Sequence, residues 1–185
     1  MRWPSWSPPQ PFRLPEASIS RSRAIQRTAI ATCLSFGRVQ VTFRKLVEDR
    51  LSTWEALRGE RTRVPGTPMA LGRGGLPHDL VQMIVEGTLC IENGFWGSVA
   101  AGATFKSTGR KRTRPGRAVI AANRKRIADA EGVVGMHYSL WQANEPTPTA
   151  PRFDEVSRVW AELGDRGELT MEWPTLRVLA VDPGR

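Results

Sequence analysis

The alternation of apolar and polar residues along the chain first becomes regular at residue 39. Residues 39–46, VQVTFRKL, alternate as a half-buried strand does. Residues 53–64 predict two strands joined by a turn, or one strand with a bulge at Gly59. Near the C-terminus, residues 169–174 predict a last regular strand, and residues 175–182 predict another strand or an extended tail.

A helical period replaces this alternation over about residues 77–90. Pro77 suits the first helical position, and Asp79 suits the positive end of the helix dipole. One broad arc is apolar, with Leu80, Val81, Ile84, Val85 and Ile91. The opposite arc carries the polar stripe His78, Asp79, Gln82 and Glu86. Residues 92–94, Glu-Asn-Gly, are a stop signal for this helix.

Two further helices are expected downstream. One runs over about residues 117–130, and on to Trp141 if Gly132 and Gly135 are tolerated in its interior. The other covers about residues 153–163, where Phe, Val, Trp and Leu recur at helical spacing.

Strands at both ends with helices between them predict an α+β fold. We expect a small antiparallel sheet, formed by the N-terminal strands and a C-terminal strand, packed against about three helices. Residues 39–185 are predicted to be a single domain, with residues 145–151 as a stiff polyproline-like connector. No window approaches ~18 consecutive apolar residues, so no transmembrane helix is predicted.

The first 38 residues differ from the rest in composition. Five prolines in the first fifteen residues exclude a helix or central strand there. Residues 1–38 are interpreted as a disordered extension, or as the product of a start codon upstream of the natural one. The Arg- and Ser-rich character also resembles a transit peptide, an interpretation we favour less.

The net charge of +9 is concentrated rather than spread over the chain. Residues 106–126 contain nine basic residues and no acidic one. The remainder of residues 39–185 is mildly acidic, so the basic segment predicts a local patch and not a globally basic protein. Its basic residues are Lys106, Arg110, Lys111, Arg112, Arg114, Arg117, Arg124, Lys125 and Arg126.

This basic segment predicts an anion-binding site. Its first half is rich in Ser, Thr, Gly and Pro, which favours an exposed loop whose cations could neutralise phosphates. Nucleic acid is the first candidate partner and an acidic protein the second, although no known nucleic-acid-binding motif accompanies the segment. The competing interpretation is a solvated loop that pairs with the acidic body of the same molecule.

The polar stripe of residues 78–86 predicts an alternative function, a small metal-assisted enzyme. The spacing resembles a helical metal site, and His78, Asp79 and Glu86 with His137 are the candidate ligands. Gln82 weakens this hypothesis, because an amide is a poor ligand for a transition metal. The simpler interpretation is a solvated helix face with Asp79 as a cap, and neither a cofactor nor a catalytic residue is predicted.

Two other features predict structure and not chemistry. Residues 97–104, GSVAAGAT, lack the lysine of a phosphate-binding loop, because Ala103 stands at its position. They are interpreted as a tight turn of small residues, with Phe95, Trp96 and Phe105 filling the core. The isolated Cys33 and Cys90 are expected to be reduced thiols of a cytoplasmic protein.

The motifs at residues 41–45, 76–86, 94–105, 112–119 and 169–174 resemble a family of small uncharacterised proteins from high-GC actinobacteria. The resemblance implies a domain boundary near residue 39 and a bacterial cytosolic origin. It implies no catalytic residue, since the family has no assigned activity. Together these features predict a non-enzymatic binding protein with a basic loop, and they leave its oligomeric state open.

Overall fold

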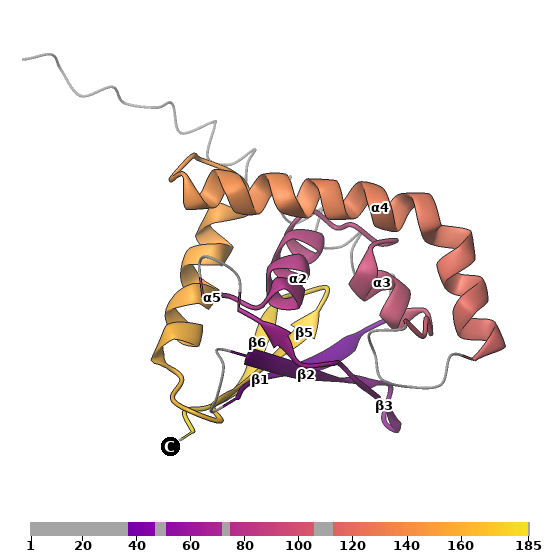
Figure 1. The fold of residues 1–185 in the computed structure, drawn as a ribbon, viewed down its shortest axis with the longest axis horizontal. Helices are drawn as coiled ribbons and strands as arrows, with labels where there is room; N and C mark the ends of the chain where they lie inside the picture. The colour runs from indigo at the N-terminus through magenta and orange to yellow at the C-terminus, as the bar shows by residue number, and fades with distance from the viewer. Residues whose placement is uncertain (1–36, 47–50, 72–74, 106–112, 185) are drawn as a thin grey trace, which may run out of the picture.

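A six-stranded antiparallel sheet with helices on one face forms the protein (Figure 1). The computed structural model describes residues 37–46, 51–71, 75–105 and 113–184. The predicted α+β class is confirmed, as is the pairing of N-terminal strands with a C-terminal strand. The expectations for residues 1–36 lie outside the described residues.

The sheet brings the two ends of the described chain together. Its strands lie in the order β3-β2-β1-β5-β6, and β4 pairs with β2 beside β3. Central β1 pairs along its length with both β2 and β5. The bounds are β1 Val39–Lys45, β2 Leu51–Arg58, β3 Thr62–Pro65, β4 Met69–Ala70, β5 Glu168–Trp173 and β6 Arg177–Asp182.

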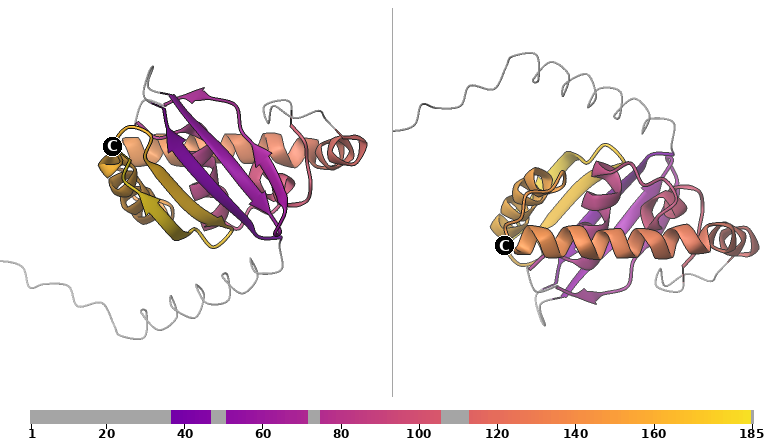
Figure 2. Two further views of the ribbon diagram at one scale, coloured as in Figure 1. Left: turned by 90° about the horizontal axis from the view of Figure 1, so that it is seen from below. Right: turned by 90° about the horizontal axis from the view of Figure 1, so that it is seen from above.

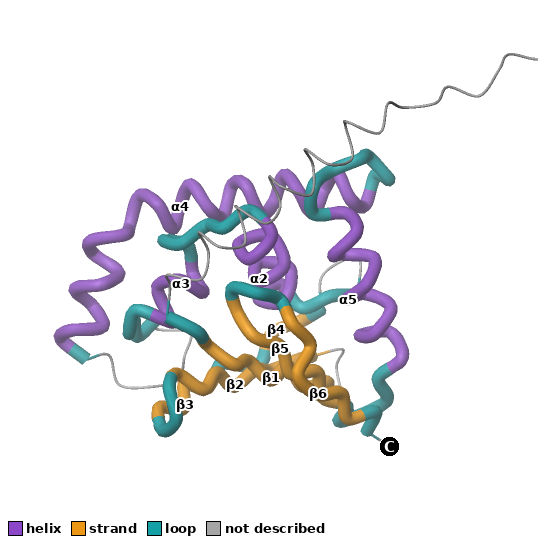
Figure 3. Tube along the Cα trace, turned by 180° about the vertical axis from the view of Figure 1, so that it is seen from behind, coloured by secondary structure: helices purple, strands orange, loops and turns teal. Residues whose placement is uncertain are grey.

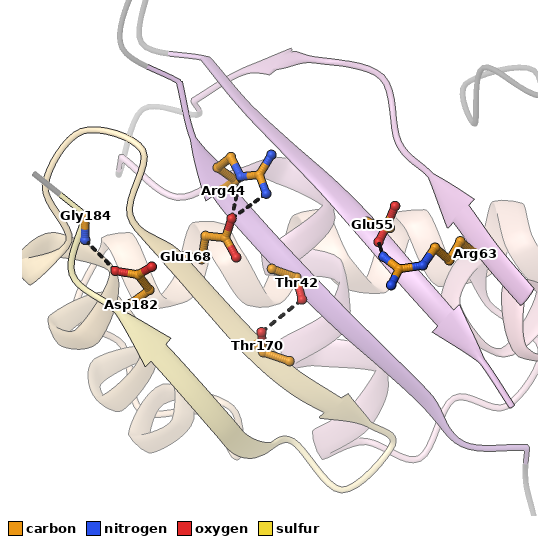
Figure 4. A network of polar contacts seen from close by, with 8 residues as sticks. All are labelled: Thr42, Arg44, Glu55, Arg63, Glu168, Thr170, Asp182 and Gly184. Carbon is orange, nitrogen blue, oxygen red and sulfur yellow. Dashed lines mark hydrogen bonds and ion pairs between the residues drawn. The ribbon is translucent and has the colours of Figure 1, made fainter. Parts of the chain in front are cut away.

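One face of the sheet forms the floor of the core and the other is open. Along β1, Val39, Val41 and Phe43 are fully buried, and the residues between them point to the opposite face. On the open face a Thr42–Thr170 hydrogen bond of 2.9 Å and ion pairs of Arg44 with Glu168 and Arg63 with Glu55 join neighbouring strands (Figure 4). The alternation of apolar and polar residues over 39–46 therefore places the apolar side chains on the buried face of the sheet.

Four helices are described, and they make two further layers. α2 lies between the sheet and the long α4, with α3 beside it and α5 at the edge (Figures 1 and 3). Their bounds are α2 His78–Thr88, α3 Phe95–Ala100, α4 Arg114–Gln142 and α5 Ala150–Glu162. None of these helices combines the length and hydrophobicity that a membrane span requires.

An aromatic cluster fills the space between sheet and helices. Trp96 of α3 contacts Phe43 and Trp54 edge-on, with ring centroids 5.9 and 5.0 Å apart, and Phe95 contacts Trp54 at 5.9 Å. Such edge-to-face geometry is favourable beyond the area that it buries. The prediction that Phe95 and Trp96 fill the core is confirmed, and Phe105, the third residue of that prediction, is partly buried and packs against the core.

Several sequence-based boundaries need correction. The expected tight turn at residues 97–104 is wrong, because its first half belongs to α3. α4 begins at Arg114, where the Thr113 side chain accepts a hydrogen bond from the Gly116 amide, and it continues to Gln142. Residues 175–182 contain strand β6, so the extended-tail alternative is excluded.

Two glycines provide a matched test of this packing. A Cβ on Gly97 would overlap the Glu92 carbonyl oxygen, whereas a Cβ on Gly135 in α4 would meet nothing within 4 Å. We predict that Gly97→Ala destabilises the fold by ~1–3 kcal/mol or more, because backbone must move. Gly135→Ala should stabilise it by ~0.5–1 kcal/mol through helix propensity. Urea denaturation measures both, and equal effects would contradict the position of α3.

Candidate functional site

The polar stripe of α2 faces other helices and not solvent. Gln82 and Glu86 are 1% and 0% exposed, so the interpretation as a solvated helix face is wrong for this half of the stripe. Every residue from Leu80 to Gly87 is buried. The sequence held a signal for this, because residues 80–87 are apolar on almost every side, which is typical of a buried helix.

Glu86 caps the N-terminus of α3. Its Oε1 accepts a hydrogen bond from the Phe95 amide at 2.7 Å, and its Oε2 accepts one from the Trp96 amide at 2.9 Å. Gly94 leaves room for this carboxylate, because a Cβ there would overlap it. α3 has no side-chain cap of its own, so a residue of α2 satisfies its first amides.

Gln82 connects this carboxylate region to α4. Its Nε2 donates to Oε1 of Glu131 at 2.8 Å. The other oxygen of Glu131 lies 3.7 Å from Nε2 of His78, a half-exposed side chain at the start of α2. The sequence did not single out Glu131, because nothing local indicates that α4 crosses α2 at this point.

Asp79 anchors aromatic residues instead of capping its own helix. Its Oδ2 accepts from Nε1 of Trp54 at 2.6 Å, and its backbone oxygen accepts from Nε1 of Trp96 at 2.9 Å. α2 has no side-chain cap, so the expectation that Asp79 caps it is wrong. His78 lies nearby, with Nδ1 3.6 Å from Oδ1 of Asp79.

The four predicted metal ligands do not come together. His137 is 8% exposed and its Nδ1 lies 3.0 Å from Oγ1 of Thr149, at the junction of α4 and α5. Both carboxylate oxygens of Glu86 are engaged by backbone amides. Among the described residues, no three His, Cys, Asp or Glu side chains form a group that could hold a metal ion.

The pKa values of Glu86 and His78 are both raised by their surroundings. Burial raises the pKa of Glu86 to about 8, although the amides of Phe95 and Trp96 favour the ionised form. The Asp79 carboxylate raises the pKa of His78, and Glu131 adds to this effect. The folded protein therefore holds protons at pH values where the unfolded chain has released them.

We predict that the protein becomes less stable as the pH rises from about 4.5 to about 8. In this interval unfolded Glu86 is ionised while the folded side chain keeps its proton. The stability contributed by protonated His78 is likewise lost above its ordinary pKa of 6.5. The free energy of unfolding should fall by an amount on the order of a few kcal/mol, measured by urea denaturation at several pH values.

The Glu86→Met variant separates the contribution of Glu86 to this pH dependence from the contribution of His78. Whatever its absolute stability, this variant should show a flatter dependence on pH than the parent, and His78→Ala should flatten it less. A stability that rises from pH 5 to pH 8, or an unchanged slope in Glu86→Met, would contradict the buried position of the carboxyl group.

Cys90 follows α2 with a φ of 54° and is disulfide-bonded. The expectation of a reduced thiol at this position is therefore wrong. The expectation for Cys33 lies outside the described residues.

The basic segment is described only in part. Lys106, Arg110, Lys111 and Arg112 lie outside the described residues. The remaining five basic side chains are exposed on the first half of α4: Arg114, Arg117, Arg124, Lys125 and Arg126. The part expected to be a loop therefore continues into a helix, and the first turns of that helix extend beyond the sheet (Figure 2).

The underside of this half of α4 borders a cavity of about 410 Å³. The other walls come from α3, the turn before it, the end of β5 and Gly37. The cavity opens to the surface beside exposed Glu92 and Ala101. Its lining residues are Gly37, Glu92, Asn93, Gly97, Ala100, Ala101, Asn123 and Trp173. Sequence reasoning missed it, because its walls come from four separate segments.

Comparisons with protein-family models, curated proteins and solved structures found no match for this chain. The resemblance to an actinobacterial family therefore stays a prediction.

Proposed function

We propose that the protein binds nucleic acid through the basic first half of α4. The observation that carries this proposal is the charge of residues 114–126, which contain five exposed basic side chains and no acidic one. The first acidic residue of the helix is Asp129. The positive end of the helix dipole adds to this potential at Arg114.

Four of these cations, Arg114, Arg124, Lys125 and Arg126, make at most one exposed ion pair with the rest of the described protein. Lys125 pairs with Asp129 at 2.9 Å, but both side chains are largely exposed, so water and salt screen the pair. No described carboxylate forms an ion pair with Arg114, Arg124 or Arg126. Their charge is therefore available to phosphate groups.

The helical spacing favours a linear polyanion. At 3.6 residues per turn, Arg114, Arg117, Arg124 and Lys125 fall within about 100° of arc. α4 bends in its first half, so this stripe follows a curve and not one straight helix axis (Figure 1). A sugar–phosphate backbone offers a continuous, flexible run of charges that can follow this stripe, whereas an acidic protein surface has no fixed charge spacing.

We predict salt-sensitive binding to random-sequence oligonucleotides. If the five described cations contact about four phosphates, the plot of log K against log salt should have a slope of roughly −3 to −4. Replacing Arg114 and Arg124 by Ala should weaken binding about tenfold or more at low salt and make the slope shallower by about 1.5. Fluorescence anisotropy across a salt series measures both quantities.

Arg158→Ala/Arg166→Ala is the matched control, because it removes two exposed arginines from α5 and the turn that follows it. This variant should bind as the parent does. Equal losses in the two double variants would mean that only net charge matters, and salt-independent binding or no binding would refute the proposal.

A further inference from the structure

We propose that the cavity beneath α4 takes one unpaired base of a bound single strand while the arginines beside it hold the strand's phosphates. This inference rests on the proposed function and names the form of nucleic acid that the same surface recognises. A base in a duplex is paired and stacked, so only a single strand could present one to a cavity.

The cavity has the size of a small-ligand site. About 410 Å³ lies at the lower end of the range for such sites, which suits one base and excludes a folded polymer. The buried Trp173 side chain contributes an aromatic wall, and Ala100 and Gly97 contribute small apolar ones. A Cβ on Gly97 would lie 3.3 Å from Trp173, so glycine keeps this wall open.

Two amide side chains give the cavity hydrogen-bonding capacity for a base edge. Asn93 precedes α3 and Asn123 lies on α4, and both line the cavity while remaining half-buried. Each amide carries donors and an acceptor, the pairing that lets asparagine recognise the edge of a base. They come from different elements, so a base between them would join α3 to α4.

The charge distribution orients the nucleotide. Glu92 is an exposed carboxylate in the cavity lining, and it disfavours entry of a phosphate. It can accept a hydrogen bond from the exocyclic amino group of a base. The uncharged base is therefore the part that enters, and the phosphate stays outside.

The helix places cations next to the cavity on the outside. Arg126 lies three residues after Asn123, where side chains are neighbours on the helix surface, and Arg124 lies about 100° around the helix on the other side of Asn123. Cβ atoms at this spacing are about 5–6 Å apart, which is within the dimensions of one nucleotide. One base in the cavity and its flanking phosphates on α4 therefore fit together.

An abasic strand isolates the contribution of the base. We expect the full-length protein to bind a 12-nucleotide oligodeoxycytidine roughly tenfold tighter than an abasic strand of equal length and charge, at one salt concentration. Asn123→Leu and Ala101→Leu should each remove most of this ratio and leave the salt slope unchanged. Gln142→Leu, an amide replacement at the far end of α4, should keep the ratio.

The outcomes separate this inference from the function on which it rests. Equal, salt-dependent binding of both strands would overturn the base site and leave the phosphate-binding proposal intact. The base site would also be overturned if both Asn123→Leu and Ala101→Leu kept the parent's preference for oligodeoxycytidine over the abasic strand. The base would then bind elsewhere. Absence of binding to either strand would refute both proposals.

Discussion

The hydrogen bonds between the buried carboxyl group of Glu86 and the first amides of α3 determine how the helices are arranged. Without these bonds, two backbone donors and a carboxyl group would be buried and unsatisfied at the same place. A six-residue helix does not hold its shape alone, so α3 depends on this contact from α2. The aromatic side chains of Phe95 and Trp96 are thereby directed into the core above β1 and β2.

The same contact supports the proposed binding surface. α3 supplies Gly97 and Ala100 to the cavity and its C-cap supplies Ala101, so the orientation of α3 sets the cavity's shape. Gln82, one turn before Glu86, contacts Glu131 and holds α4 across α2. The buried polar residues therefore have a structural role, and the cations of the proposed binding surface lie on the exposed side of α4. This division explains why the metal-site hypothesis singled out side chains that are engaged in packing.

The order of apolar and polar residues predicted those strands and helices that form from contacts between near neighbours in the chain. β1 followed from alternation, and α2 and α4 followed from helical periodicity. β2 and β3 form the strand pair that was one of the two alternatives predicted for residues 53–64. α3 could not be predicted, because its cap comes from Glu86, nine residues before its first residue. The burial of Gln82 was missed because its partner Glu131 lies 49 residues away. The basic residues of α4 were visible in the sequence, but the cavity between α3 and α4 was not.

Hydrogen–deuterium exchange at the amides of Phe95 and Trp96 tests the role of Glu86 most directly. If the carboxyl group caps α3, both amides exchange as slowly as the core of β1 in the parent protein, and they lose protection in Glu86→Ala before β1 does. Exchange at the rate of an exposed loop in the parent, or unchanged protection of both amides in Glu86→Ala, would contradict the account.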